Sequence, residues 1–146
     1  MKLVTGHFGE IEFDLERFII FEEGLPGFEG LKRFILIEDN DSESPFSYLQ
    51  SIEDTDISFV VTDPYQFSKS YAPRIPEVYF EKLGNGESKE YTVLNIVTVP
   101  RDINLTTINL QAPLLIHINS RKGMQVNLEV TDYKTKHLLV DLVKEA

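Results

Sequence analysis

The chain has no cysteine among its 146 residues, and it has no long apolar run. The first absence excludes disulfides and thiolate metal sites, and it fits a reducing cytosol. No stretch approaches the ~20 apolar residues that span a bilayer. The N-terminus lacks the apolar segment of a signal peptide. We therefore expect a cytoplasmic protein that makes no contact with a membrane.

Sequence motifs for catalysis, metal binding and phosphate binding are missing too. The chain contains no G-x-S-x-G, Walker A or Rossmann fingerprint. The acidic stretch 39–50 begins like a calcium loop, but Ser44 replaces its glycine and Gln50 its final glutamate. None of the three histidines has a metal-ligand partner in its own segment (His7, His117 and His137). We predict no enzyme activity, no cofactor and no metal.

Negative charge is concentrated in the first part of the chain. Residues 1–63 hold 15 acidic and 4 basic residues, a net charge of −11, whereas residues 64–146 hold 9 and 10, a net charge of +1. Such an acidic half repels phosphate, so we expect no direct nucleic-acid binding. It attracts a basic protein instead. Solubility alone would explain the net charge of −10 but not its uneven distribution.

The two-residue period of β-strands dominates the sequence. Segments rich in Ile, Val, Phe, Tyr and Thr predict strands in residues 9–15, 17–21, 33–38, 57–63 and 91–99. A hairpin is predicted downstream, with strands over 107–119 and 124–130 joined by the turn 120–123. Together these segments give roughly seven strands.

The hairpin pattern also predicts which side chains are buried. Even-numbered apolar residues from Ile108 to Ile118 share one side, and Asn109, Gln111 and His117 share the other. Pro113 falls on the polar side and removes a ladder donor, so a bulge or an edge is expected there. The second strand alternates likewise, and its apolar side holds Met124, Val126, Leu128 and Val130.

Helix signals are few. Pro76 and Gly84 bracket one predicted helix. A short turn or helix is expected around 44–51. Residues 136–146 suit a helical or mobile tail, with a last strand as the alternative. Because so few helices exclude βαβ units, we predict a mainly β fold: a small single-domain antiparallel β-barrel-like structure over residues 1–146, with one or two short helices.

The stretch FEEGLPGFEG (21–30) predicts a shaped corner between two strands. Gly24 and Gly27 permit positive φ angles. Pro26 stiffens the turn, and Phe28 is expected to fill the core beneath it. The acidic neighbours are the better candidates for contact with a partner: Glu22, Glu23 and Glu29.

Two more corners contain proline. Asp63 is expected to accept a hydrogen bond from its own turn, and Pro64 ends the preceding strand. The segment NLQAP (109–113) sets amide side chains beside Ala112 and Pro113. Turn chemistry explains each corner by itself. Together they indicate a rigid scaffold that displays loops and a sheet edge, as a binding protein does.

Five ordered segments resemble the flagellar assembly factor FliW family: EEGLPGFEGLKRF, PFSYLQS, FVVTDPY, TINLQAPLLIHI and GMQV. The resemblance covers nearly the whole chain. It implies a small β-barrel-like protein of the bacterial cytoplasm that has no catalytic activity. It also implies two partners, newly made flagellin and the RNA-binding translational repressor CsrA. In the scheme that the resemblance implies, free flagellin occupies the factor, and the released repressor silences flagellin mRNA.

Candidate contact residues follow from charge and from the corners. We expect a basic repressor to meet the acidic corner or a second acidic group, Glu53, Asp54 and Asp56. Flagellin is expected at an apolar groove or edge near 107–119, and the amide candidates are Asn109, Gln111 and Gln125. The alternative function is a small-ligand- or carbohydrate-binding β-barrel module, which requires a concave site with convergent polar groups.

Overall fold

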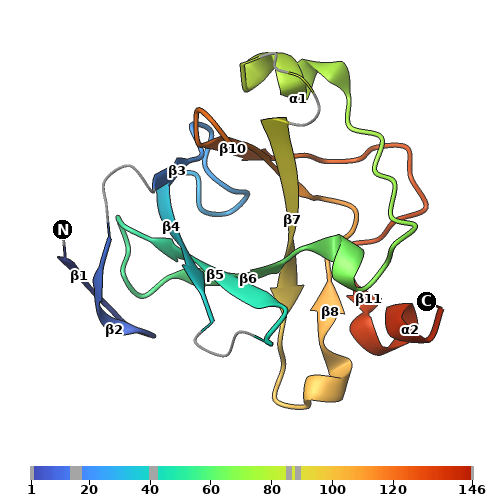
Figure 1. Cartoon of the computed structure of the whole chain (residues 1–146), viewed down its shortest axis with the longest axis horizontal. Coiled ribbons are helices and arrows are strands. Elements are labelled where there is room, and N and C mark those ends of the chain that lie inside the picture. The colour runs from blue at the N-terminus through green and yellow to red at the C-terminus, as the bar shows by residue number, and fades with distance from the viewer. Residues whose placement is uncertain (1, 14–17, 40–42, 85–86, 88–89, 146) are drawn as a thin grey trace.

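Seven strands close into a barrel in the computed structural model, which describes residues 2–13, 18–39, 43–84, 87 and 90–145 (Figure 1). In spatial order they are β7 (Tyr91–Thr98), β6 (Ser58–Thr62), β5 (Phe46–Ser51), β4 (Arg33–Glu38), β3 (Phe18–Ile20), β10 (Lys122–Gln125) and β9 (Leu114–His117). Pairing of β9 with β7 completes the ring. Every neighbouring pair in it is antiparallel except β3 with β10. The predicted mainly antiparallel barrel is confirmed.

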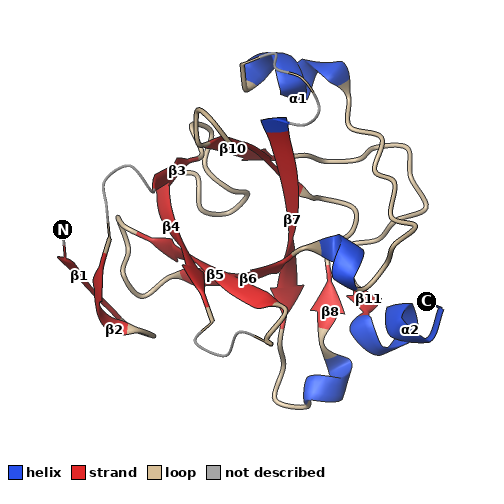
Figure 2. Cartoon of the chain, in the orientation of Figure 1, coloured by secondary structure: helices blue, strands red, loops and turns tan. Residues whose placement is uncertain are grey.

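The remaining elements lie around this ring. β8 (Thr107–Ile108) and β11 (His137–Leu138) extend the sheet from β7. The hairpin of β1 (Lys2–Thr5) and β2 (Gly9–Glu12) forms a separate two-stranded sheet at one side (Figure 2). The short helical elements are η2 (Pro64–Gln66), α1 (Glu77–Lys82), η4 (Ile103–Leu105) and α2 (Leu139–Glu145). The helix predicted after Pro76 is therefore present, and the C-terminal tail contains both a strand and a helix.

Residues 46–51 form strand β5, so the turn or helix expected there is wrong. β5 pairs with β4 on one side and with β6 on the other. Leu49, Gln50 and Ser51 are fully buried. The side-chain nitrogen Nε2 of Gln50 donates to the carbonyl oxygens of Ser51, Thr55 and Ile57 at 2.9–3.2 Å. Pairing with β4 and β6, together with these side-chain hydrogen bonds, therefore outweighs the turn preference of the serines and the proline.

The first strand of the predicted hairpin is in fact two strands, β8 and β9, and both pair with β7. Val97 lies opposite Ile108, whereas Leu94 lies opposite Leu114. Three steps along β7 thus correspond to six along its partner, so three extra residues bulge out between β8 and β9. The bulge includes Pro113, where the sequence indicated one.

An insertion of three residues is odd in number, so it exchanges the two faces of the strand. Ile108 packs in a cluster outside the barrel, whereas Leu114 and Ile116 point into the barrel interior. The prediction that the even-numbered residues from 108 to 118 share one side is therefore wrong. Ile118 follows the end of β9 and is 51% exposed, and His117, expected on the polar side, is buried.

Val130 also differs from expectation. It is 98% exposed, because β10 ends at Gln125 and the apolar alternation after it belongs to an irregular segment.

Three clusters make up the core: one fills the barrel, one lies against α2, and one lies against α1. Phe21, Phe34 and Leu49 fill the barrel without exposure to solvent.

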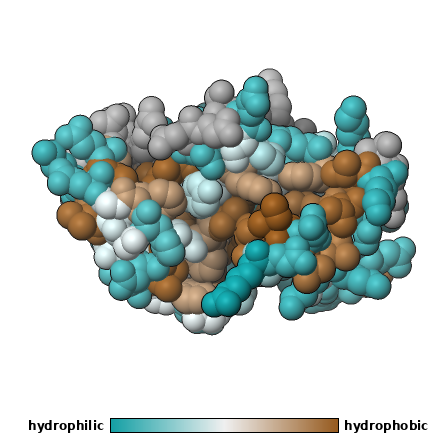
Figure 3. Space-filling view, turned by 90° about the horizontal axis from the view of Figure 1, so that it is seen from below, coloured by the Kyte–Doolittle hydropathy of each residue, from teal (hydrophilic) through white to brown (hydrophobic). Residues whose placement is uncertain are grey.

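Exposed apolar side chains gather on the face seen from below in Figure 3, the side on which the β7–β8 connection and α2 lie in Figure 1. Those that belong to these elements are Val99, Ile103, Leu105, Val140 and Val143. α2 is amphipathic: Leu139 and Leu142 are buried, while the valines beside them face solvent.

Candidate functional site

The corner predicted at residues 21–30 is formed as expected at its glycines. Gly24 and Gly27 have φ angles of +69° and +83°. A Cβ on Gly24 would lie 2.5 Å from the Cα of Glu29, whereas one on Gly27 would have no neighbour within 4 Å. Gly24 is therefore required for both its backbone angle and its close packing, and Gly27 for its angle alone.

Leu25, rather than Phe28, fills the core beneath this corner. Leu25 is 2% exposed, while Phe28 is 36% exposed and stacks edge-on against Phe59 with ring centres 5.2 Å apart. The amide of Phe28 donates to the carbonyl of Leu25 at 2.7 Å. This tight turn reverses the chain between the two residues, so only one of them reaches the barrel interior.

The three glutamates of the corner lie on the surface. The carboxylate of Glu22 pairs with Lys122 at 3.0 Å, and that of Glu23 pairs with Lys82 at 3.5 Å. Glu29 accepts a hydrogen bond from the amide of Gly27 at 3.1 Å. The corner is thus tied to β10 and α1 by ion pairs, which partly offset its negative charge.

The second acidic group lies in the loop between β5 and β6, directly beside the corner segment. The Glu53 carboxylate accepts hydrogen bonds from the amides of Lys32 and Arg33 at 3.3 and 3.1 Å. Asp54 accepts from the amide of Asp56 at 3.1 Å, and both aspartates are exposed. The fold therefore places the two acidic groups, far apart in sequence, on adjacent loops.

The amide candidates lie at the bulge between β8 and β9. The side-chain oxygen of Asn109 accepts from the amides of Gln111 and Ala112 at 3.1 and 3.0 Å. The side-chain nitrogen of Gln125 donates to the carbonyl of Ala112 at 3.1 Å. Both side chains thus stabilise the bulge itself, and Gln111 is half-buried beside them.

The buried side chains of Tyr71 and Asn95 also form hydrogen bonds at this bulge. The Tyr71 hydroxyl donates to the carbonyl of Leu110 at 2.7 Å, and the side-chain nitrogen of Asn95 reaches that hydroxyl at 3.3 Å. Burial raises the pKa of Tyr71 to about 12, although the hydrogen bond from Asn95 opposes the rise.

The corner predicted at Asp63 and Pro64 also forms: Asp63 accepts from the amide of Tyr65 at 3.0 Å and precedes Pro64 at the start of η2.

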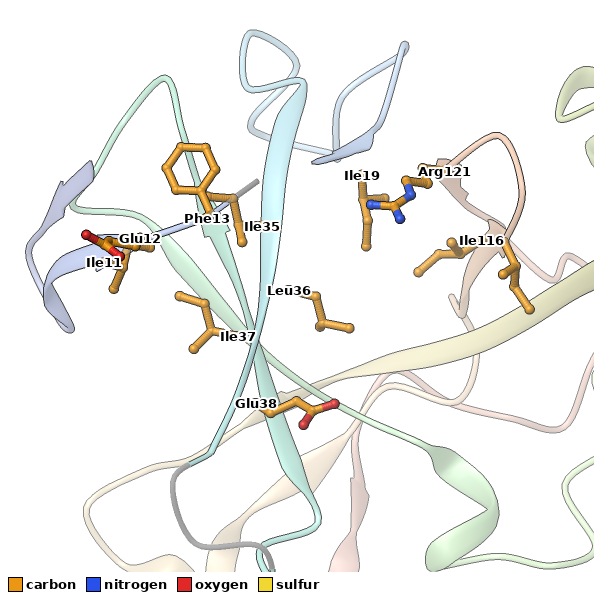
Figure 4. Close-up of a pocket in the computed structure, with 11 residues that line it drawn as sticks. Ile11, Glu12, Phe13, Ile19, Ile35, Leu36, Ile37, Glu38, Ile116 and Arg121 are labelled. Atoms are coloured by element: carbon orange, nitrogen blue, oxygen red, sulfur yellow. The ribbon is translucent and has the colours of Figure 1, made fainter. Parts of the chain in front are cut away.

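A groove of about 1020 Å³ lies beside β4 (Figure 4), and only its Ile116 and Ile118 fall in the segment 107–119 where the sequence indicated a groove or edge. Its lining comes from the β1–β2 hairpin (Ile11, Glu12, Phe13), from β3 and β4 (Ile19, Ile35–Glu38), and from β9 and the turn after it (Ile116, Ile118, Arg121). Eight of these eleven side chains are apolar. The three polar ones do not converge on one point, so the groove does not resemble a carbohydrate site.

Within the described residues, β3 pairs with β4 as far as Ile35, and β5 pairs with β4 as far as Glu38. Leu36, Ile37 and Glu38 at the end of β4 line the hollow. Arg121, in the turn between β9 and β10, also lines the hollow. Its φ of +58° places its backbone in the left-handed region.

No metal or membrane feature emerges from the part of the chain that the structure describes. Its His, Asp and Glu side chains form no group of three that could hold a metal ion. Within the same residues, no helix has the length and apolar character needed to cross a bilayer.

Comparison with known proteins gives one consistent result. The sequence profile of the family described as "FliW protein" matches residues 2–139. The flagellar assembly factor FliW of Alkaliphilus metalliredigens is 40% identical over 145 residues, which cover 99% of this chain and 90% of the relative. That of Thermoanaerobacter pseudethanolicus is 39% identical over 146 residues, 100% of this chain and 97% of the relative.

A solved structure supports the same assignment. A crystal structure of the flagellar assembly factor FliW superimposes with a TM-score of 0.88 at 35% sequence identity, and it covers 95% of this chain and 96% of its own. At this identity the match concerns more than the fold. The sequence profile, the relatives and the shared barrel fold thus agree, and this chain belongs to the FliW family of flagellar assembly factors.

Proposed function

We propose that this chain is a non-enzymatic regulator of the bacterial cytoplasm that binds newly made flagellin and antagonises the repressor CsrA. Sequestration of the repressor then relieves repression of flagellin mRNA. The family membership supports the assignment to flagellar assembly. The observation that carries the repressor part is the adjacency of two acidic loops, joined where Glu53 binds the amides of Lys32 and Arg33.

The charge on this surface suits a basic RNA-binding partner. Glu22 and Glu23 already have lysine partners, and Glu53 pairs with Arg33. Among the described contacts, no cation pairs with Asp54 or Asp56. These two aspartates therefore offer the least compensated charge of the acidic surface, and we assign them the main electrostatic contact with the repressor.

Partner exchange requires that flagellin and the repressor exclude each other. This follows if their footprints overlap, or if binding at one site lowers affinity at the other. A coupling of 1–3 kcal/mol, typical of such systems, changes affinity by roughly 5- to 150-fold. That range is sufficient for the concentration of free flagellin to control the release of the repressor.

The experiment is calorimetric titration with purified CsrA and flagellin, separately and together, at low and high salt. The test variant carries Asp54→Lys and Asp56→Lys. Its matched control carries Glu129→Lys and Asp132→Lys, which change net charge equally at exposed positions of the other half. We expect repressor affinity to fall with salt and to fall further in the test variant than in the control. Equal affinity in both variants and at both salt concentrations would exclude the acidic loops as the contact.

A further inference from the structure

We propose that the extended segment after β10, residues 126–129, and the pocket beside it form a docking site for an extended peptide, which adds one strand there. The pocket has a volume of about 790 Å³ and is lined by residues from 72–79 and from 127–133. The identity of the partner rests on the proposed function, because we assign the peptide to flagellin. The location and the extended form rest on the hydrogen bonds, burial and charges of this surface.

Residues 126–129 continue as an extended chain beyond the end of β10. The amides of Val126 and Leu128 donate to the carbonyls of Pro113 and Gln111 at 2.8 and 3.0 Å. Val126 and Leu128 are 0% and 3% exposed, whereas the residues that follow each of them are exposed. Alternate pairing and alternate burial are the properties of a strand. One edge of this strand is therefore occupied by the bulge between β8 and β9.

The other edge of the same segment is open. In an extended chain the backbone groups of successive residues point to opposite edges, so those of Asn127 and Glu129 face away from the bulge. Within the described part of the chain, neither their amides nor their carbonyls have a hydrogen-bond partner. A second extended chain can pair with these groups through its own backbone. A helix cannot, because its backbone groups are already bonded to one another.

The pocket adjoins this open edge. Asn127 and Glu129 both line it, whereas residues 111–113 do not. Its other wall is the connector 72–76 and the start of α1, and in Figure 1 the two segments run along the right side of the molecule. The amide of Ala72 donates to the hydroxyl of Tyr133 at 2.9 Å and so ties the two walls together. A partner therefore meets a site that is already formed.

The size and the lining of the pocket fit a short strand. Strands lie about 4.8 Å apart, sheets pack about 10 Å apart and each residue advances about 3.3 Å, so one residue occupies roughly 160 Å³. A volume of about 790 Å³ then holds roughly five residues. Leu128 lies at the base, while Val78 and Val130 are 48% and 98% exposed at the sides. Every second side chain of a bound strand can cover these apolar surfaces.

The charges of the pocket distinguish between the two partners of the proposed function. Arg74, Glu129 and Asp132 line it, and among the described contacts none of them forms an ion pair. Because charges of both signs are free, the pocket suits a segment of mixed charge rather than a uniformly basic protein. The acidic loops that we assign to the repressor contribute no residue to it. We therefore assign the peptide to newly made flagellin, whose unassembled chain can present an extended segment.

The first test measures amide–water exchange by NMR on the full-length labelled protein, alone and with unlabelled flagellin or CsrA. Flagellin should slow exchange of the Asn127 and Glu129 amides at least tenfold, because each gains an acceptor. The Leu128 amide is the internal control: it is already bonded to Gln111 and should change little. CsrA should leave all three amides unchanged.

The second test is titration of flagellin into four variants. Glu129→Pro removes the amide and sets a ring at the open edge, while its control Glu129→Ala removes only the side chain. Val78→Asp places a charge in the pocket, and its control Val99→Asp alters a valine of similar exposure outside it. We expect Glu129→Pro to weaken binding about fivefold or more, as one lost hydrogen bond requires. Val78→Asp should weaken it severalfold, and both controls should stay within about twofold of the wild type. Melting temperatures verify folding.

The outcomes separate this inference from the proposed function. If flagellin binds but leaves exchange at Asn127 and Glu129 unchanged, the inference is overturned and the proposed function stands. If CsrA rather than flagellin slows these amides, the edge takes the repressor and the inference is again overturned. If Glu129→Ala weakens flagellin binding as much as Glu129→Pro, the side chain and not the backbone makes the contact, which contradicts an added strand. If the wild type binds no flagellin, the proposed function fails together with this inference.

Discussion

Glu53 and Arg33 are joined twice: the Glu53 carboxylate accepts the Arg33 backbone amide at 3.1 Å and lies 3.5 Å from its guanidinium Nε. The link fixes the β5–β6 loop to the start of β4. Glu53→Ala should lower the free energy of unfolding by about 1–3 kcal/mol, because it leaves backbone amides without their acceptor. Urea denaturation measures this. Glu10→Ala, which removes only an exposed pair with Lys2, should cost about 0.5 kcal/mol or less. Equal costs would mean that Glu53 acts merely as a surface charge.

The two positive-φ glycines of the corner should differ in tolerance. Gly27→Ala meets open space and should cost about 1–2 kcal/mol for its left-handed backbone. Gly24→Ala adds a clash with the backbone of Glu29, so its cost should be clearly larger or folding should fail. Thermal denaturation of both variants tests the order. A smaller loss for Gly24→Ala would contradict the close approach.

Leu110 and Ile118 share one side of the strand by sequence, yet the structure separates them. Leu110 is 1% exposed and Ile118 is 51% exposed. Leu110→Ala should therefore cost about 2–5 kcal/mol, and Ile118→Ala less than about 1 kcal/mol. Chemical denaturation of the two variants decides between this register and uninterrupted alternation, for which the two costs would be similar.

Tyr71 should make stability depend on pH in the alkaline range. Its pKa is about 12 in the folded protein against 10.0 ordinarily, so the folded state holds the proton more tightly. Stability is then complete below pH 10 and is lost as pH rises from 10 to 12, by roughly 3 kcal/mol at most. Unfolding free energies at pH 9 and pH 11 measure the loss. Tyr71→Phe should make it smaller; Tyr48 and Tyr65, whose pKa values burial also raises, contribute the remainder. An unchanged loss in Tyr71→Phe would exclude this hydroxyl as a source.

The local sequence pattern was sufficient to locate the strands that are rich in β-branched and aromatic residues. β4 and β7 are rich in Ile, Val and Phe or Tyr, and the sequence located both. β5 was missed because its buried Gln50 is acceptable only when carbonyls from a neighbouring loop surround its amide nitrogen. The bulge before β9 was expected at Pro113, but the number of inserted residues, which decides the faces, is set by pairing with β7.

The sequence likewise identified the residues of some candidate sites but not of others. Charge counting singled out the residues of both acidic loops, although it gave no reason to place them side by side. The groove beside β4 was not located from the sequence because its lining comes from four segments that are far apart in the chain. A local pattern carries no signal for contacts between distant segments.

The single parallel pairing in the ring has a consequence for the order of folding. Among the described residues, Ile20 and Lys122 are the one registered pair between β3 and β10, and the amide of Ile20 donates to the carbonyl of Arg121 at 2.9 Å. All other neighbours in the barrel pair antiparallel, most of them through short connections. Closing this seam joins residues about a hundred positions apart, which costs the most chain entropy and favours a late event. The same seam should open first in the native state, so the Ile20 amide should exchange with deuterium faster than the amides of β5.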